Sequence, residues 1–293
     1  MTHFFIAIPT FNAAPYLDQL LASLVYQSGE FRLSVHVQDC KSTDGTREIV
    51  RRWQSMQKEG LLSSSCVQIS FTSVRDKGLY DAIARASEKV SDENCIMTWI
   101  GADDALMHGA LATAASIFTQ HDDVMWLTGS PHVANEKGEV FTPWPPPRFS
   151  RYYLYSGRQD GRGRGDESTQ TFIMQEGTFW RFKLWKKAGG INSSFKLAGD
   201  WDLWRRFAEH APLYSVDCPL ACFSRRLGQK SSDMEGYYAE IDKIGYRKPP
   251  FSEVASYHLT RYPWATDWKV EVMQHRSRSK FDAISHMLRF PRR

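Results

Sequence analysis

Hydrophobic and polar positions near the start of the chain switch repeatedly between two spacings. Alternation with a period of two residues predicts strands, whereas apolar residues three or four positions apart predict the buried face of a helix. The predicted strands cover residues 3–9, 31–37, 67–74 and 95–100, and the predicted helices start near Pro15, Thr46, Leu79 and Gly109. This order indicates an α/β fold with a mixed, mostly parallel central sheet flanked by helices.

The pattern changes after Val124. Short strands are expected around a turn at residues 136–138, and a glycine- and arginine-rich loop is expected at 157–166. Beyond it, one helix is predicted over residues 182–188, and a second helix opens at Asp200. The chain beyond Val124 therefore has its own, less regular architecture.

Composition narrows the class of protein only slightly. The 293 residues are 42% hydrophobic and carry a formal net charge of +4, which is too small for so long a chain to indicate nucleic-acid binding. The five cysteines show no CxxC spacing, and no secretory leader or run of roughly 20 apolar residues is visible. We therefore expect a cytoplasmic protein with reduced thiols.

Aspartates follow several of the predicted strands. Asp39, Asp76, Asp103 and Asp104 would meet at one edge of the sheet, because the carboxyl ends of parallel strands share an edge. Two adjacent carboxylates can bind Mg²⁺ or Mn²⁺, whose remaining ligands are often substrate phosphates. The alternative interpretation of Asp103 and Asp104 is the N-cap of the following helix.

Several motifs occur in a fixed order along the chain. They are AIPTFN at 7–12, QDCKSTDGT at 38–46, DKGLYDA at 76–82 and GADD at 101–104, followed by matching segments at 175–181, 199–206 and 224–226. In these segments the chain resembles the inverting family-2 glycosyltransferases of GT-A fold. The resemblance covers about the first 230 residues and implies transfer of a sugar from a nucleotide-diphosphate donor.

The resemblance also implies roles for individual residues on the donor side. Pro9, Thr10 and Asn12 would border the nucleoside, and Asp39 would accept the imide hydrogen of a uracil base. These expectations make a UDP-sugar the preferred donor.

The motifs at 76–82 and 101–104 contain the remaining residues of the implied donor site. Asp76 and Lys77 would approach the ribose or the diphosphate. Asp103 would contact the ribose or the sugar, and Asp104 would be the stronger ligand of a Mn²⁺ or Mg²⁺ ion. Similar enzymes often carry a histidine where this chain has Leu227, and leucine cannot bind a metal.

Asp200 matches the catalytic base of similar enzymes. An inverting transfer needs one carboxylate near the acceptor hydroxyl to take its proton. The glutamate that commonly precedes this aspartate is replaced here by Gly199, which leaves the handling of the acceptor open. The alternative interpretation is that Asp200 caps the helix that follows it.

Four residues of the segment at 175–181 are candidates for acceptor or donor-sugar contacts: Gln175, Thr178, Trp180 and Arg181. Aromatic faces pack on sugar rings, while amides and guanidinium groups bind hydroxyls or phosphates. The equally weighted alternative is a buried Phe179–Trp180 pair beneath a surface arginine.

The expected organisation has two parts. Residues 1–232 form the catalytic domain, with a nucleotide-sugar half at 1–123 and an acceptor half at 124–232, and residues 233–293 form an extension. Its basic end places Phe281, Ile284, Met287 and Leu288 on one helical face. This tail would either lie on an anionic membrane at its inner face or pack on the catalytic domain.

The sequence thus predicts a metal-assisted, inverting transfer to a hydroxyl of a glycan or lipid-linked glycan in envelope polysaccharide assembly. A non-catalytic nucleotide-sugar-binding or assembly subunit is the alternative, because the glutamate before Asp200 and the histidine at Leu227 are missing. A nucleic-acid partner is not expected.

Overall fold

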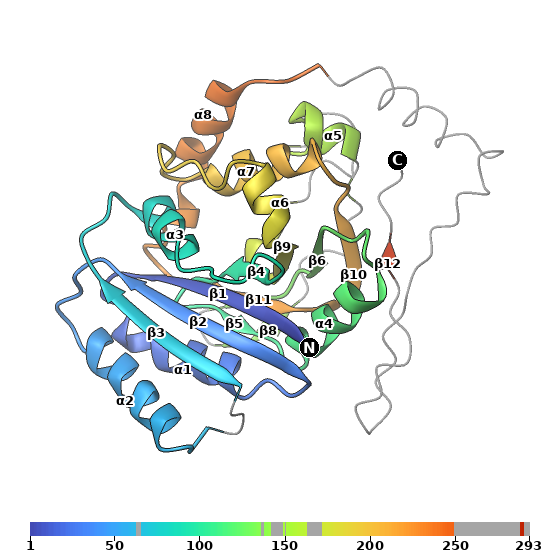
Figure 1. The fold of residues 1–293 in the computed structure, drawn as a ribbon. Helices are drawn as coiled ribbons and strands as arrows, with labels where there is room; N and C mark the ends of the chain where they lie inside the picture. The colour runs from blue at the N-terminus through green and yellow to red at the C-terminus, as the bar shows by residue number, and fades with distance from the viewer. Residues whose placement is uncertain are drawn as a thin grey trace.

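The computed structural model describes residues 1–62, 66–135, 138–141, 149, 151–162 and 172–248, together with a strand at 288–289. An eight-stranded sheet crosses the molecule in the order β12-β10-β6-β9-β4-β1-β2-β3 (Figure 1). A smaller sheet has the order β5-β11-β7-β8. The mixed α/β architecture predicted from the sequence is confirmed.

Each strand of the larger sheet has the following bounds: β1 Thr2–Thr10, β2 Phe31–Asp39, β3 Val67–Ser73, β4 Ile96–Trp99, β6 Trp126–Ser130, β9 Thr178–Arg181, β10 Tyr214–Pro219 and β12 Leu288–Arg289. The smaller sheet contains β5 Ala105–Leu106, β7 Val133–Ala134, β8 Val140–Phe141 and β11 Ala221–Ser224. β1 runs parallel to both β2 and β4, and β2 runs parallel to β3. These four strands therefore end at a common carboxyl edge.

The helices lie on both faces of the sheet (Figure 1). One face is covered by α1 (Ala14–Val25), α2 (Thr46–Lys58) and α4 (Ala110–Gln120), and the other by α3 (Leu79–Ser87), α6 (Phe182–Lys187) and α7 (Gly199–Ala208). The remaining helical segments are α5 (Arg151–Ser156), α8 (Met234–Ile244), and the 3-10 turns η2 (Gln175–Gly177) and η3 (Lys230–Ser232). No helix of the described residues is long and apolar enough to cross a membrane.

β1 shows why the sheet is buried on both sides. Phe4, Ile6 and Ile8 belong to the core shared with α1, α2 and α4, whereas Phe5 and Ala7 belong to the core shared with α3, α6 and α7. Successive side chains of a strand point to opposite faces, so both sets are apolar. A central strand held from both faces gives the loops at its carboxyl end a rigid base.

β9 departs from the parallel pattern. It lies between β4 and β6 and runs antiparallel to both, with Trp180 opposite Met97 and Arg181 opposite Ile96. The strand therefore starts near the carboxyl edge of β4 and ends at its amino edge. Residues only a few positions apart around β9 consequently belong to opposite edges of the sheet.

The predicted amphipathic tail helix is wrong at Leu288. The backbone there forms a strand that pairs antiparallel with β10, with Leu288 opposite Val216. Phe281, Ile284 and Met287 lie outside the described residues, as does most of the glycine- and arginine-rich loop.

Candidate active site

The loops after β1 and β2 are tied together at the carboxyl edge. Asn12 has a positive φ of 50°, and its side-chain oxygen accepts a hydrogen bond of 3.0 Å from the backbone of Thr43. The backbone amide of Asn12 in turn donates a hydrogen bond of 2.8 Å to the Ser42 hydroxyl. Asparagine tolerates this left-handed backbone better than most residues. The predicted nucleoside contact Asn12 is thus a structural link between two loops, and it is exposed.

Asp39 ends β2, directly opposite Thr10 at the end of β1. Its carboxylate is 1% exposed and accepts hydrogen bonds from the Ser73 hydroxyl at 2.6 Å and the Ser42 amide at 3.1 Å, as well as from the Ser42 hydroxyl. The Thr10 hydroxyl lies 3.4 Å away. These contacts fix the orientation of Asp39, and its role toward a base stays a prediction.

The loop after β3 presents the third motif. Asp76 accepts a hydrogen bond of 3.0 Å from the Gly78 amide, and Asp81 accepts one of 3.0 Å from the Lys77 amide. Gly78 has φ 128°, a conformation that favours glycine. The Lys77 side chain is exposed at the same edge as Asp39, so its ammonium group is available to an anionic ligand.

The acid pair follows β4, but it does not cap a helix. Asp103 and Asp104 lead into β5, and α4 begins only at Ala110 behind the N-cap residue Gly109. The helix-cap interpretation is therefore wrong for both residues. They sit instead where the larger sheet meets the smaller one.

The two acids have different surroundings. Asp103 forms an ion pair of 2.6 Å with Arg226 and accepts a second bond of 2.9 Å from Gln229. Asp104 is only 5% exposed and accepts one hydrogen bond of 2.9 Å from the Ser224 amide. Burial, reinforced by the charges of Glu176 and Asp103, raises the pKa of Asp104 well above its usual value. Asp104 is thus the carboxylate with less countercharge.

Glu176 completes this group, although the sequence analysis did not select it. It lies in η2, just before β9. Its charge acts on Asp104, and the charges of Asp200 and Asp103 act on it. Burial first, and then the charges of Asp200 and Asp103, raise the pKa of Glu176 to about 7. Only its position between two selected residues, Gln175 and Thr178, could have pointed to it.

Asp200 lies in the first turn of α7. The N-cap position of this helix is Ala198, so the interpretation of Asp200 as the cap is wrong. Burial raises its pKa to about 6, while a hydrogen bond of 3.2 Å from the Tyr80 hydroxyl acts in the opposite direction. A carboxyl group with this pKa is ionised at neutral pH and can still take up a proton, as a general base must.

Gln175 and Thr178 lie near the carboxyl edge, but protein atoms already engage their polar groups. The Gln175 amide donates to the backbone oxygen of Trp99. The Thr178 side chain is fully buried and bonds to the hydroxyl of Thr128 at 2.9 Å and to the Met174 carbonyl at 2.7 Å. Thr178 therefore supports the β6–β9 pairing, and Gln175 stays a candidate contact.

Trp180 and Arg181 do not belong to the site, because β9 carries them away from it. Trp180 has 0% exposure and packs among other indole rings, with centroid distances of 5.2 Å to Trp99 and 5.6 Å to Trp204. Arg181 donates at 2.7 Å to the Phe118 carbonyl, near the end of α4. The predicted sugar contacts at these two positions are wrong, and the buried Phe179–Trp180 pair is the observed arrangement.

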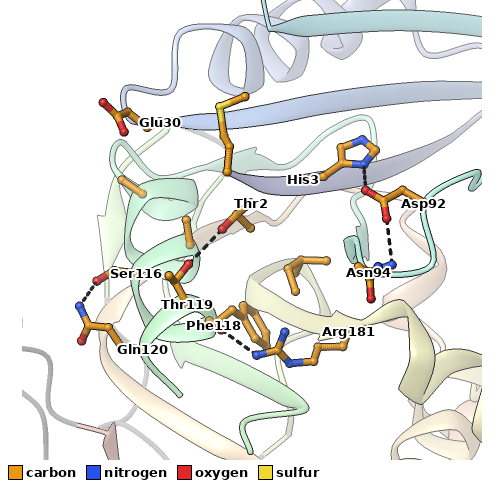
Figure 2. Close-up of a pocket in the computed structure, with 14 residues that line it drawn as sticks. Thr2, His3, Glu30, Asp92, Asn94, Ser116, Phe118, Thr119, Gln120 and Arg181 are labelled. Carbon is orange, nitrogen blue, oxygen red and sulfur yellow. Dashed lines mark hydrogen bonds and ion pairs between the residues drawn. The ribbon is translucent and has the colours of Figure 1, made fainter. Parts of the chain in front are cut away.

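A hollow of about 580 Å³ opens at the amino edge of the sheet (Figure 2), and its lining includes none of the aspartates that follow β2, β3 and β4. Its lining includes Arg181, Thr119 and His3, whose ring bonds to Asp92 at 3.0 Å and to Ser34 at 2.9 Å. The hydrogen bond from His3 and then the Asn94 amide lower the pKa of Asp92. The His3 and Asp92 side chains at this hollow are therefore paired with each other.

The acid pair suits a divalent cation in its chemistry. Mg²⁺ and Mn²⁺ prefer carboxylate oxygens, and a cation would relieve the repulsion that raises the pKa of Asp104. Among the described residues, no three or more His, Cys, Asp or Glu side chains converge in a metal-holding arrangement. A cation could still be held by Asp104 and Asp103 if phosphate oxygens supply the remaining ligands.

Leu227, which stands where similar enzymes have a histidine, is 86% exposed. The side chains on either side of it provide the contacts instead, since Arg226 and Gln229 both bind Asp103. Arg226 also lies over the ring of Tyr16, 4.7 Å from its centroid. In this chain a cationic arginine, Arg226, thus lies beside the acid pair and contacts Asp103.

Solved structures of low sequence identity share the fold. The S. aureus TarS fragment 1–349 in complex with UDP-GlcNAc has a TM-score of 0.58 and 19% identity, and the match covers 83% of this chain and 65% of the TarS chain. The mannosyltransferase PcManGT from Pyrobaculum calidifontis, in complex with GDP-Man and Mn²⁺, has a TM-score of 0.54 and 16% identity, covering 90% and 72%. The chain thus spans less than two thirds of the TarS fragment.

Sequence comparison gives the family directly. No curated protein sequence matches the chain. The profile described as Glycosyl transferase family 2, however, matches residues 5–183, which is more than half of the chain and includes all the strands that lead to the acid pair. Together with the shared fold, this match shows that the chain belongs to glycosyltransferase family 2 and has the GT-A fold.

Proposed function

We propose that the protein is an inverting glycosyltransferase that moves a sugar from a nucleotide diphosphate to an acceptor hydroxyl. One observation carries this proposal. Asp104, Glu176 and Asp200 come from segments far apart in the sequence, yet their charges act within one group at the carboxyl edge of the sheet. Strongly raised pKa values in such a group are typical of functional sites.

In the proposed reaction Asp200 is the base. It takes the proton of the acceptor hydroxyl while that oxygen attacks the anomeric carbon, and the bond from this carbon to the diphosphate oxygen breaks. The nucleoside diphosphate leaves with the bonding electron pair. A Mn²⁺ or Mg²⁺ ion held at Asp104 and Asp103 would stabilise the charge on the leaving diphosphate. Lys77, exposed at the same edge, supplies a further positive charge.

The donor is a nucleotide sugar, and we favour a UDP-sugar. The TarS fragment binds UDP-GlcNAc and PcManGT binds GDP-Man with Mn²⁺, which supports a nucleotide-sugar donor without selecting the base. The preference for uracil rests on Asp39, which the resemblance places opposite the imide group. A glycan or glycolipid of the cell envelope, met at the inner face of the membrane, is the acceptor class that we propose.

Turnover with a donor panel tests the proposal. The chain is incubated with UDP-glucose, UDP-GlcNAc or GDP-mannose, with and without Mn²⁺, and release of the nucleoside diphosphate is measured with glycan acceptors present. We expect release with at least one donor, and we expect Asp200→Asn to lower it at least 1000-fold while calorimetry shows unchanged donor binding. An Asp200→Asn variant that stays active contradicts the assignment of the base.

The same experiment separates the proposal from a non-catalytic role. The absence of the glutamate before Asp200 and of the histidine at Leu227 motivates a subunit that only binds a nucleotide sugar. Such a subunit would bind a donor of the panel and release no diphosphate with any acceptor. The ionisable Asp200 near Glu176 favours the enzyme, because binding alone needs no base of this pKa.

A further inference from the structure

The structure explains why a glycine stands at position 199. The ring of Tyr80, from α3, lies directly against its backbone. A Cβ atom at position 199 would stand 2.7 Å from Cδ2 and 2.8 Å from Cε2 of that ring. Real Cβ atoms do not approach aromatic carbons so closely, and Tyr80 is itself only 3% exposed. Glycine at 199 and tyrosine at 80 are therefore complementary, although 119 positions separate them.

The hydroxyl of the same tyrosine reaches the proposed base. It lies 2.6 Å from the Leu197 carbonyl and 3.2 Å from Oδ1 of Asp200. A phenol has one proton, so it donates to one of these oxygens at a time. When Asp200 is ionised, the proton can turn to the carboxylate. When Asp200 carries a proton, the phenol can donate to Leu197 and its oxygen can accept from Asp200.

The backbone before Asp200 is held from the other side by α8. The Glu240 carboxylate accepts hydrogen bonds from three consecutive amides, at 2.9 Å from both Lys196 and Leu197 and at 2.8 Å from Ala198. Three amide donors to one carboxylate make a strong anchor. Tyr80 and Glu240 thus fix residues 196–198, and Asp200 follows in the first turn of α7.

The ionisable groups around Asp200 come from three elements. Tyr80 belongs to α3, Glu176 to η2, and Glu240 and Tyr237 to α8. Burial raises the pKa of Asp200 most, and the charge of Glu240 adds to this, whereas the Tyr80 hydrogen bond lowers it. Tyr237 has no hydrogen bond to Asp200, although both residues belong to the described part of the chain. Tyr80 is therefore the neighbour whose hydroxyl favours the ionised base.

We propose that Tyr80 is a positioning residue that holds Asp200 in both its ionised and its protonated state, and that its ring takes the space of the side chain preceding the base in similar enzymes. The proposal rests on the proposed function only for the identity of the base. It explains how a chain with Gly199 can keep the base oriented, since a residue from another helix provides the support.

A titration of Asp200 in the intact protein tests the contact without substrate. Carboxyl carbons of aspartate are labelled with ¹³C, and the Asp200 signal is assigned by its loss in Asp200→Asn. We expect Tyr80→Phe to raise the pKa of Asp200 above the wild-type value of about 6, because the variant keeps the ring and loses the donor. The matched control Tyr237→Phe should leave it within a few tenths of a unit. An unchanged value in Tyr80→Phe overturns the proposal.

Kinetics then distinguish positioning from a structural role. Tyr80→Phe should lower kcat about tenfold, leave the KM for the donor unchanged, and move the acidic limb of the pH profile upward by the same amount as the titration. A fall in kcat without a moved limb overturns the positioning role. If Tyr80→Phe shifts the pKa of Asp200 but the wild-type chain turns over no donor, the proposed function is contradicted. The contact between Tyr80 and Asp200 is then still supported.

The fit between Gly199 and the Tyr80 ring can be tested separately, by thermal unfolding. Gly199→Ala should lower the melting temperature by several degrees in the wild-type background and by much less in a Tyr80→Ala background, where the ring is absent. Equal losses in both backgrounds overturn the claim that the ring excludes a side chain at 199. This readout does not depend on turnover, so it remains informative for variants that lose activity.

Discussion

The two edges of the same sheet handle charge in opposite ways. At the amino edge, His3 and Arg32 pair with Asp92, and Arg181 bonds to backbone carbonyls around a hollow of about 580 Å³. At the carboxyl edge, burial and mutual repulsion raise the pKa values of Asp104 and Glu176. The amino edge shows a hollow beside paired charges, and the carboxyl edge shows carboxylates with raised pKa values.

This difference indicates which edge binds a ligand. A paired charge contributes to folding and needs no partner, whereas buried carboxylates without countercharge weaken the fold unless a cation or a proton relieves them. Such an arrangement is retained where a function uses it. The following experiments test this contrast between the two edges.

The largest effect on donor binding is expected at the acid pair. Asp104→Asn should weaken Mn²⁺-dependent donor binding about 100-fold or more, because the amide cannot supply a charged ligand to the cation. Calorimetric titration with the donor found in the panel measures this. Asp92→Asn is the matched change at the amino edge and should leave donor affinity unchanged. Equal losses in the two variants would remove the distinction between the edges.

The pH dependence of turnover should show a smaller effect. The pKa of Asp200 is raised to about 6, so the base is ionised above this pH and protonated below it. Turnover should therefore be nearly constant from pH 7 to pH 8 and fall about tenfold for each pH unit below 6. Initial rates at saturating donor provide the measurement. Rates that stay constant down to pH 5 would exclude a base with this pKa.

Arg181 should matter for stability and not for turnover. Arg181→Met removes hydrogen bonds of 2.9 Å to the Val124 carbonyl and 2.7 Å to the Phe118 carbonyl. We expect the free energy of unfolding to fall by about 2 kcal/mol, with kcat and KM unchanged. Urea unfolding and initial rates measure the two properties separately. A raised KM for the donor would return Arg181 to the list of sugar contacts.

Glu176 should have the smallest effect, and its sign depends on pH. Its pKa is about 7 in the folded protein, above the usual value, so folding favours the protonated form. Stability is therefore lost as the pH rises from about 4.5 to 7. Glu176→Gln should stabilise the protein at pH 8, on the order of 1 kcal/mol after solvent screening, and be nearly neutral at pH 4. Thermal unfolding at both pH values provides the comparison, and destabilisation at pH 8 would contradict it.

The parallel half of the fold could be predicted from the sequence. The strand and helix patterns up to α4 appear within a few residues of their observed bounds. β1 and β4 are apolar on both faces, β2 and β3 alternate apolar and polar residues, and each helix has an apolar stripe. β9 could not be placed in the same way. Its direction depends on pairing with β4 and β6, which no local pattern specifies.

The limits of the site prediction follow from that strand. Trp180 and Arg181 lie close in sequence to Glu176, yet the antiparallel direction of β9 takes them to the core and to the opposite edge. The acids at the ends of β2, β3 and β4 could be predicted to share one edge, because parallel strands bring their carboxyl ends to the same side of a sheet. The support of Asp200 by Tyr80 could not be predicted, since it depends on the packing of two helices whose contacting residues are 120 positions apart in the sequence.

The hydrogen bonds between Glu240 and the loop before Asp200 show that a helix beyond the family motifs supports the candidate site. The family profile stops at residue 183, and the motifs stop near Arg226, yet α8 supplies the carboxylate that accepts the amides of residues 196–198. A chain shortened at the predicted boundary of 232 would keep every recognisable motif and lose this anchor. We therefore expect the smallest unit that keeps the proposed base oriented to extend at least to Ile244.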